Sequence, residues 1–283
     1  MVTRLNIVHE TRYDFSNEVF LDPHYLRFKP RTTPYNQLVS HDLRITPIPS
    51  NHNALSDAEN NLVQLYHFHG MHKNLVIYAV SEVVLNENNP YDFIVFPENH
   101  LDMPFEYSPM LKSILGATLF TTQMGHPLMS YGSSIMASSY YKTVAFINAL
   151  TERIHADFFR ESRLEGIPYE PDQTFTQKRG SCRDLSWMQI QLLRKLGIAA
   201  RFCSGYYFMG AGSTAHELHA WVEAYIPGAG WAGFDPSHGA MAGGAHIPIC
   251  SSAYYQHTMP ITGSYRGNAH STMNTSLSIE QMA

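Results

Sequence analysis

Hydrophobic and polar residues alternate along the first third of the chain. The apolar positions are Leu5, Ile7 and Tyr13, then Val39, Leu43 and Ile45. Because successive side chains of a strand point to opposite faces, a period of two predicts half-buried strands. Gly70–Asn74 separate the apolar runs 62–69 and 75–85, which predicts a hairpin. The even spacing of these strands predicts a β-sandwich over residues 1–105.

The pattern changes after the proline-rich segment around residues 97–109. Apolar residues then recur every three or four positions, first at Val144, Ile147, Leu150 and Ile154, then at Leu185, Met188, Leu192 and Leu196. This period predicts two core-facing helices. Strand patterns return over residues 200–208, 218–226, 231–235 and 273–279. The sequence therefore predicts a second, α+β domain over residues 106–283.

Composition narrows the class of protein. With 283 residues the chain is long enough for about two domains. Its net charge of −5 has the wrong sign for binding a phosphate backbone, and no apolar run is long enough to span a membrane. Three cysteines cannot form a disulfide framework, and residues 1–7 have no apolar signal segment. We expect a cytoplasmic protein with neither nucleic acid nor membrane as partner.

The strongest candidate for chemistry is the segment Gly180-Ser181-Cys182-Arg183-Asp184, at the point where the second predicted helix begins. Ser181 is suited to be the N-cap residue, which places Cys182 in the first turn. The positive end of the helix dipole and the neighbouring Arg183 both favour a thiolate over a thiol. A cysteine so placed is a candidate nucleophile.

A base and an orienting group follow on two neighbouring strands, at His219 and Asp235. A cysteine nucleophile needs a base, and the base needs a third group that holds its tautomer. The two side chains share a face only if the loop between the strands has an odd length or the strands contain a bulge. We expect one imidazole nitrogen of His219 to bond to Asp235 and the other to face Cys182.

Four further short segments accompany the one around Cys182: Gly197-Ile198-Ala199-Ala200-Arg201, Gly205-Tyr206, His219-Ala220-Trp221 and Gly230-Trp231…Asp235-Pro236. Together these segments resemble the transglutaminase-like superfamily of papain-fold cysteine enzymes. The first third of the chain is similar to the N-terminal β region of bacterial members. The resemblance implies a Cys182–His219–Asp235 triad that attacks a carboxamide or peptide carbonyl of a protein or peptide substrate through a thioester. Arg183 stands where animal transglutaminases have Trp, and Ala199 replaces a frequent Pro.

Two rival functions stay open at this stage. One is a cysteine peptidase or amidase, in which water always accepts the acyl group. The other is a catalytically silent module that holds peptides in the same cleft. The sequence predicts no cofactor and no metal: His216-Glu217-Leu218-His219 lacks zincin spacing, and His67, His69 and His72 are expected to be solvated. Cys203 and Cys250 are expected to be structural, and no oligomeric state is predicted.

Overall fold

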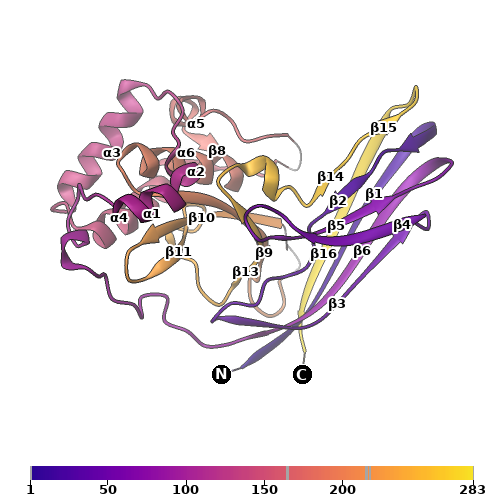
Figure 1. Cartoon of the computed structure of the whole chain (residues 1–283), viewed down its shortest axis with the longest axis horizontal. Helices are drawn as coiled ribbons and strands as arrows, with labels where there is room; N and C mark the ends of the chain where they lie inside the picture. Colours follow the sequence, from indigo (N-terminus) through magenta and orange to yellow (C-terminus); the bar gives the residue numbers. More distant parts are fainter. Residues whose placement is uncertain (1, 164–165, 214–215, 217, 283) are drawn as a thin grey trace.

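The computed structural model describes residues 2–163, 166–213, 216 and 218–282. Figure 1 shows a strand-rich part on one side and a helix-covered part on the other, with both ends of the chain near the strand-rich part. None of the described helices is long and apolar enough to cross a membrane.

Two antiparallel sheets pack face to face in the strand-rich part and form the predicted β-sandwich. One has five strands, with β15, β1, β6 and β3 in order and β16 also paired with β1; the other has four, in the order β14, β2, β5, β4. Side chains of Phe15, Leu75, Leu26 and Phe28 fill the space between them. The strands are β1 (Thr3–Leu21), β2 (His24–Leu26), β3 (Asn36–Thr46), β4 (Asn51–Ser56), β5 (Leu62–His67), β6 (Met71–Leu85), β14 (Ile261–Thr262), β15 (Tyr265–Arg266) and β16 (Ser271–Gln281).

The predicted hairpin over residues 62–85 is wrong, although both of its strands exist. β5 pairs with β2 and β4, whereas β6 pairs with β1 and β3 in the other sheet. Gly70, with φ of +81°, lies where the chain passes from one sheet to the other. Both strands bury apolar side chains between two sheets, and the alternation alone cannot distinguish this crossing from a hairpin.

The C-terminal strand also lies elsewhere than predicted. β16 runs antiparallel to β1, with Ile279 opposite Ile7 and Thr275 opposite Thr11. The strand predicted for the second domain therefore completes the first sheet, next to β1 in Figure 1. The division at residue 105 stays a prediction, and the sandwich contains strands from well beyond it.

The helix-covered part is built on a five-stranded antiparallel sheet in the order β12, β11, β10, β9, β13. The predicted strands and both predicted helices are present, and α6 is buried along most of its length against the sheet. The strands of the five-stranded sheet are β9 (Ala200–Tyr207), β10 (Leu218–Ile226), β11 (Gly230–Asp235), β12 (Ala240–Met241) and β13 (His246–Ser252), and β7 (Phe159–Arg160) and β8 (Arg179–Gly180) form a separate two-stranded sheet. The helices are η1 (Glu98–His100), α1 (Pro109–Ile114), α2 (Gly116–Leu119), α3 (His126–Ser138), α4 (Thr143–Asp157), α5 (Pro171–Gln177), α6 (Cys182–Lys195) and η2 (Tyr255–Thr258).

The sandwich packs against the edge of this sheet that β9 and β13 form. Tyr206 and Ile247 are buried against Leu5 and Ile7 of β1 in one apolar cluster. Gly205 allows the close approach of β9 to β13, because a Cβ there would lie 2.2 Å from the carbonyl oxygen of Ile247. The two parts are thus joined by a packed core, which brings β1 and β16 to the N-terminal end of α6.

Candidate active site

The N-terminal end of α6 is held by a buried carboxylate. Ser181 is the N-cap residue, as predicted, and Cys182 is the first residue of the helix. Asp184 accepts hydrogen bonds from the Ser181 backbone N–H and hydroxyl at 2.7 and 2.6 Å. It also accepts from Arg163 Nη2 at 2.6 Å and from the Tyr169 N–H at 2.7 Å. Asp184 therefore holds the start of the helix in place, and it also holds Arg163 and Tyr169 beside that start.

Helix α6 is also fastened to strand β10, which carries His219. One turn after Cys182, the Ser186 hydroxyl donates to the Ala220 carbonyl at 3.1 Å. The Ala220 backbone N–H in turn bonds to the sulfur of Cys182. These contacts hold the thiol beside the strand, and Cys182 is only partly exposed.

The register between β10 and β11 has the predicted parity. Tyr225 lies opposite Trp231 and Ile226 opposite Gly230, so the loop is the three residues 227–229. Three is an odd number, as a shared face requires. Odd-numbered residues of the two strands therefore share a face. This parity places His219 and Asp235 on the same side of the sheet.

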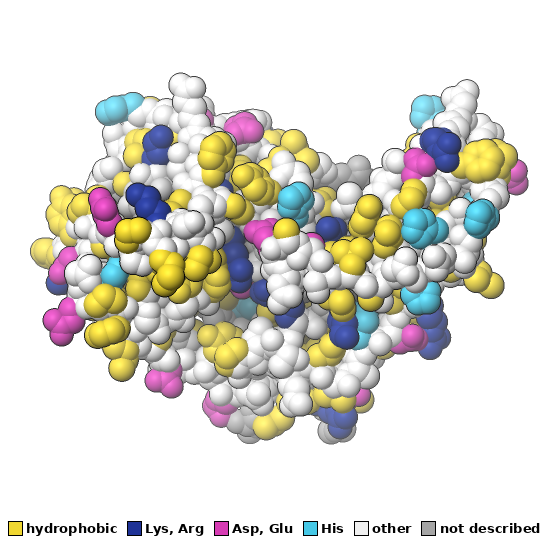
Figure 2. Space-filling model, in the orientation of Figure 1, with side chains coloured by type: hydrophobic (Ala, Val, Ile, Leu, Met, Phe, Trp, Pro, Cys, Tyr) yellow, Lys and Arg dark blue, Asp and Glu magenta, His cyan; other side chains and the backbone are white. Residues whose placement is uncertain are grey.

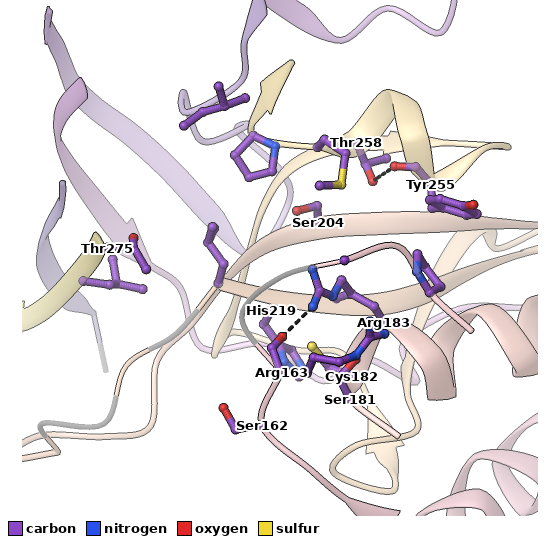
Figure 3. A pocket seen from close by; sticks show the side chains of 18 of the residues that line it. Ser162, Arg163, Ser181, Cys182, Arg183, Ser204, His219, Tyr255, Thr258 and Thr275 are labelled. Carbon is purple, nitrogen blue, oxygen red and sulfur yellow. Dashed lines mark hydrogen bonds between the residues drawn. The ribbon is translucent and has the colours of Figure 1, made fainter. Parts of the chain in front are cut away.

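The two side chains meet in the interior. His219 Nε2 lies 2.7 Å from Asp235 Oδ2, and the two residues are 2% and 0% exposed. The other ring nitrogen, His219 Nδ1, is buried and has no hydrogen-bond partner among the described residues. Cys182 is the group beside this ring: Figure 3 shows the two side chains next to each other, and Cys182 contributes to the raised pKa of His219. The structure thus brings together all three residues that the sequence singled out.

Two further histidines, which sequence reasoning missed, contact the same carboxylate oxygen. His238 Nδ1 lies 2.7 Å and His246 Nε2 2.9 Å from Asp235 Oδ2. The Ser237 backbone N–H donates to the other oxygen, Oδ1, at 2.8 Å. His238 lies three residues after Asp235 and could have been noticed from spacing. His246 reaches the site from β13, and no local pattern points to it.

The protonation states of Cys182, His219 and Asp235 follow from their surroundings. Burial lowers the pKa of His219, but Asp235 and Cys182 outweigh it and raise that pKa to about 9. Burial raises the pKa of Cys182, but His219, the Ala220 N–H and Arg183 outweigh it and leave that pKa below its ordinary value. Burial likewise opposes the charge on Asp235, whose pKa nevertheless falls because three imidazoles contact it. These shifts favour a thiolate–imidazolium pair, beside an ionised carboxylate, over the neutral thiol–imidazole pair.

The convergence of one carboxylate and three imidazoles is also a candidate metal site. Potential ligand atoms of His219, Asp235, His238 and His246 all lie within 4.8 Å of one another, and imidazole and carboxylate are groups that can bind zinc. The hydrogen bonds favour another assignment. The Gly243 N–H donates to His246 Nδ1 at 3.2 Å, which leaves Nε2 as the nitrogen that carries hydrogen toward Asp235. We therefore assign these four residues to a hydrogen-bonded network.

The other histidine motifs contribute no further ligand set within the described part of the chain. His219 of the zincin-like motif is engaged with Asp235, and Glu217 lies outside the described residues. His72 Nε2 hydrogen-bonds to the His69 carbonyl oxygen at 2.9 Å. Several histidines lie instead on the surface of the sandwich (Figure 2), in contrast to the buried imidazoles of the site.

A cavity of about 440 Å³ opens next to Cys182 and His219. Its wall on one side comes from the sandwich, with Thr11, Met273 and Thr275 of β1 and β16. Figure 3 shows Thr275 on one side of the cavity, Tyr255 and Thr258 on another, and Cys182 beside His219 between them. The site is therefore composed of residues from both parts of the molecule.

The family models match both parts of the chain. Residues 5–84 match the bacterial transglutaminase-like N-terminal region, and residues 132–236 match the transglutaminase-like superfamily. The chain belongs to the transglutaminase-like superfamily. The second match contains Cys182, His219 and Asp235, and the first covers most of the sandwich. Membership agrees with a papain-like core preceded by a β-sandwich.

Relatives of this superfamily member extend over nearly the whole chain. An uncharacterized protein of Mycobacterium tuberculosis is 24% identical over 98% of this chain and 92% of its own length. An uncharacterized protein of Mycobacterium leprae is 20% identical over 99% of both chains. A crystal structure of a presumed cysteine protease from Cytophaga hutchinsonii superposes with a TM-score of 0.69 at 19% identity, covering 100% of this chain and 92% of that one. This likeness shows that the two-part fold is shared.

Proposed function

We propose that the protein is a cysteine acyl-transfer enzyme that acts on a carboxamide or peptide carbonyl. The observation that carries the proposal is the position of Cys182. Its thiol lies at the N-terminal end of a helix, against His219, whose far nitrogen is held by Asp235 at 2.7 Å. Nucleophile, base and orienting group are thereby present in contact, in the arrangement that covalent catalysis by cysteine requires.

The geometry supports a two-stage reaction. His219 Nδ1 holds the proton of Cys182, and the thiolate attacks the carbonyl carbon. The oxygen of the tetrahedral intermediate is stabilised by the Cys182 backbone N–H at the positive end of α6. As the C–N bond breaks, the imidazolium gives its proton to the leaving ammonia or amine, which leaves a thioester on Cys182. An amine or water then attacks the thioester, His219 accepts the proton of that nucleophile, and the C–S bond breaks, which releases the product and restores the Cys182 thiolate.

The cavity supports a protein or peptide as the substrate. A volume of about 440 Å³ suits one or two residues around the scissile amide, because ligand sites of comparable size bury a small ligand almost completely. The rest of a chain would run between Thr275 of the sandwich and Tyr255 of the core. We propose that the sandwich forms one wall of the substrate site.

A peptidase or amidase is the second candidate, and the same residues would serve it. The two differ only in the acceptor of the acyl group, amine or water. A silent binding module is disfavoured by the contact between Cys182 and His219, which a module that only binds peptides does not need.

The proposal is tested with a glutamine-rich protein such as casein and a fluorescent amine. Transamidation by the wild type would attach the amine to casein and release ammonia, amide hydrolysis would release ammonia without attaching the amine, and peptide hydrolysis would shorten the chain. Each activity should disappear in Cys182→Ala and persist in Cys203→Ala. Activity that survives in Cys182→Ala would overturn the proposal.

A further inference from the structure

The Asp235 carboxylate receives more hydrogen-bond donors than a catalytic triad needs. Oδ2 lies within 2.9 Å of ring nitrogens of His219, His238 and His246, and Oδ1 accepts from the Ser237 N–H. Asp235 is fully buried, and a buried carboxylate without donors is strongly disfavoured. The two extra histidines thus satisfy a charge that the fold has removed from water.

The tautomers of the two extra histidines are fixed by the same network. His246 Nδ1 accepts from the Gly243 N–H, so Nε2 must be its N–H nitrogen. His238 presents Nδ1 to Asp235, and its ring stacks on Tyr207 with centroids 4.2 Å apart and planes at 22°. His155 of α4 holds the intervening turn, with Nδ1 2.9 Å from the Ser237 carbonyl oxygen. Each donor is therefore itself held in place.

We propose that His238 and His246 are positioning residues that hold the Asp235 carboxylate against His219, so that Nδ1 of His219 stays directed at Cys182. The inference rests on the proposed function, because it concerns how the same triad is kept in its active geometry. Neither histidine lines the cavity beside Cys182, which separates this role from substrate contact. Without their N–H groups the buried carboxylate would turn toward its remaining donors and release His219.

The titratable groups that face this carboxylate come from several elements. They are Cys182 of α6, His219 of β10, Tyr207 of β9, His238 after β11 and His246 of β13, with Arg160 of β7 acting on Tyr207. Tyr207, Arg160 and Cys182 stay unchanged in the variants below. A change in the pH dependence of Cys182 alkylation that follows the residue at position 238 or 246 is therefore due to the replaced histidine.

The experiment treats the folded protein with iodoacetamide between pH 4 and 9. Mass spectrometry then measures the rate at which Cys182 is alkylated. An imidazole Nδ1–H is mimicked by Asn and an Nε2–H by Gln, so each position offers a matched pair. His238→Asn and His246→Gln keep a donor, whereas His238→Leu and His246→Met remove it.

We expect the pH midpoint of Cys182 alkylation to rise in the donor-free variants. The rate at pH 6 should fall about tenfold for each pH unit by which that midpoint rises, because only the thiolate reacts. The donor-keeping variants should retain most of the wild-type rate. An unchanged or lowered midpoint in His238→Leu, or donor-keeping variants as slow as the apolar ones, would overturn the inference. The partly exposed His238 tolerates substitution better than His246, and its pair is sufficient if His246→Met does not fold.

Nitrogen-15 NMR of the wild type gives a second test that needs no variant. The inference requires His246 to be protonated at Nε2 and His238 at Nδ1 near neutral pH, and the opposite tautomers would contradict it. The outcome is also separable from the proposed function. A wild-type Cys182 that reacts like an ordinary thiol would refute the function, whereas a reactive Cys182 that is indifferent to residues 238 and 246 would refute only the inference.

Discussion

His219 Nε2 lies 2.7 Å from Asp235 Oδ2, and this contact exists because the loop between β10 and β11 has three residues. One residue more or fewer would turn the two side chains to opposite faces of the sheet. The register of a short hairpin therefore determines whether this chain has a base for Cys182.

The first prediction concerns this contact. Asp235→Asn removes the charge that stabilises the His219 imidazolium, and should lower kcat by about 10²- to 10⁴-fold with little change in KM. Steady-state kinetics on the substrate identified by the amine-transfer or hydrolysis assay provides the measurement. Wild-type turnover in Asp235→Asn would remove this residue from the mechanism.

The second prediction is a bell-shaped pH profile of kcat/KM. The active pair forms as Cys182 ionises, below the ordinary pKa of a thiol, and is lost when His219 loses its proton near pH 9. The acid limb should therefore report Cys182 and the alkaline limb His219. Asp235→Asn should move the alkaline limb to lower pH, since Asp235 raises the pKa of His219. An alkaline limb that is the same in both proteins would contradict this assignment.

The third prediction concerns the sandwich wall of the cavity. Met273 of β16 lines the cavity, whereas the side chain of neighbouring Thr272 points to the other face of the strand and is exposed. Met273→Trp should fill part of the cavity and raise KM severalfold, with a smaller effect on kcat. Thr272→Trp serves as the matched control and should leave both constants unchanged. Equal effects of the two variants would show that the sandwich does not contact substrate.

The fourth prediction links the joint between the two parts to acid stability. His9 of β1 is 1% exposed and lies 3.2 Å from the hydroxyl of Tyr206 in β9. Burial lowers the pKa of His9 to about 4, below the value of about 6.5 in an unfolded chain. The unfolded state therefore binds the proton first as pH falls, and stability decreases between pH 6.5 and 4 by up to about 3 kcal/mol.

Replacing His9 with Gln keeps a polar side chain and removes this titration. The free energy of unfolding of His9→Gln, from urea titrations at pH 7 and pH 4.5, should fall less with acid than that of the wild type. The exposed His270 offers a control, because His270→Gln should keep the wild-type acid dependence. A loss of stability with acid in His9→Gln that is as large as in the wild type, or larger, would contradict the assignment.

Local features of the fold and site could be predicted from sequence, and long-range ones could not. The start of α6 at Cys182 and the face shared by His219 and Asp235 depend on capping and on strand parity within some twenty residues. The pairing of β16 with β1 joins opposite ends of the chain, and its alternating pattern suits either sheet. His246 reaches Asp235 from another strand, so only the folded structure reveals that contact.

The central claim is that Cys182 is an activated nucleophile, and its pH-dependent alkylation tests this most directly. Cys203 and Cys250 are internal controls, because burial raises the pKa of both thiols and neither lines the cavity. At pH 6 iodoacetamide should modify Cys182 and leave the other two largely intact, and His219→Ala should slow the reaction of Cys182 by at least about tenfold. Equal labelling of all three cysteines, or a Cys182 rate unchanged by His219→Ala, would contradict the account.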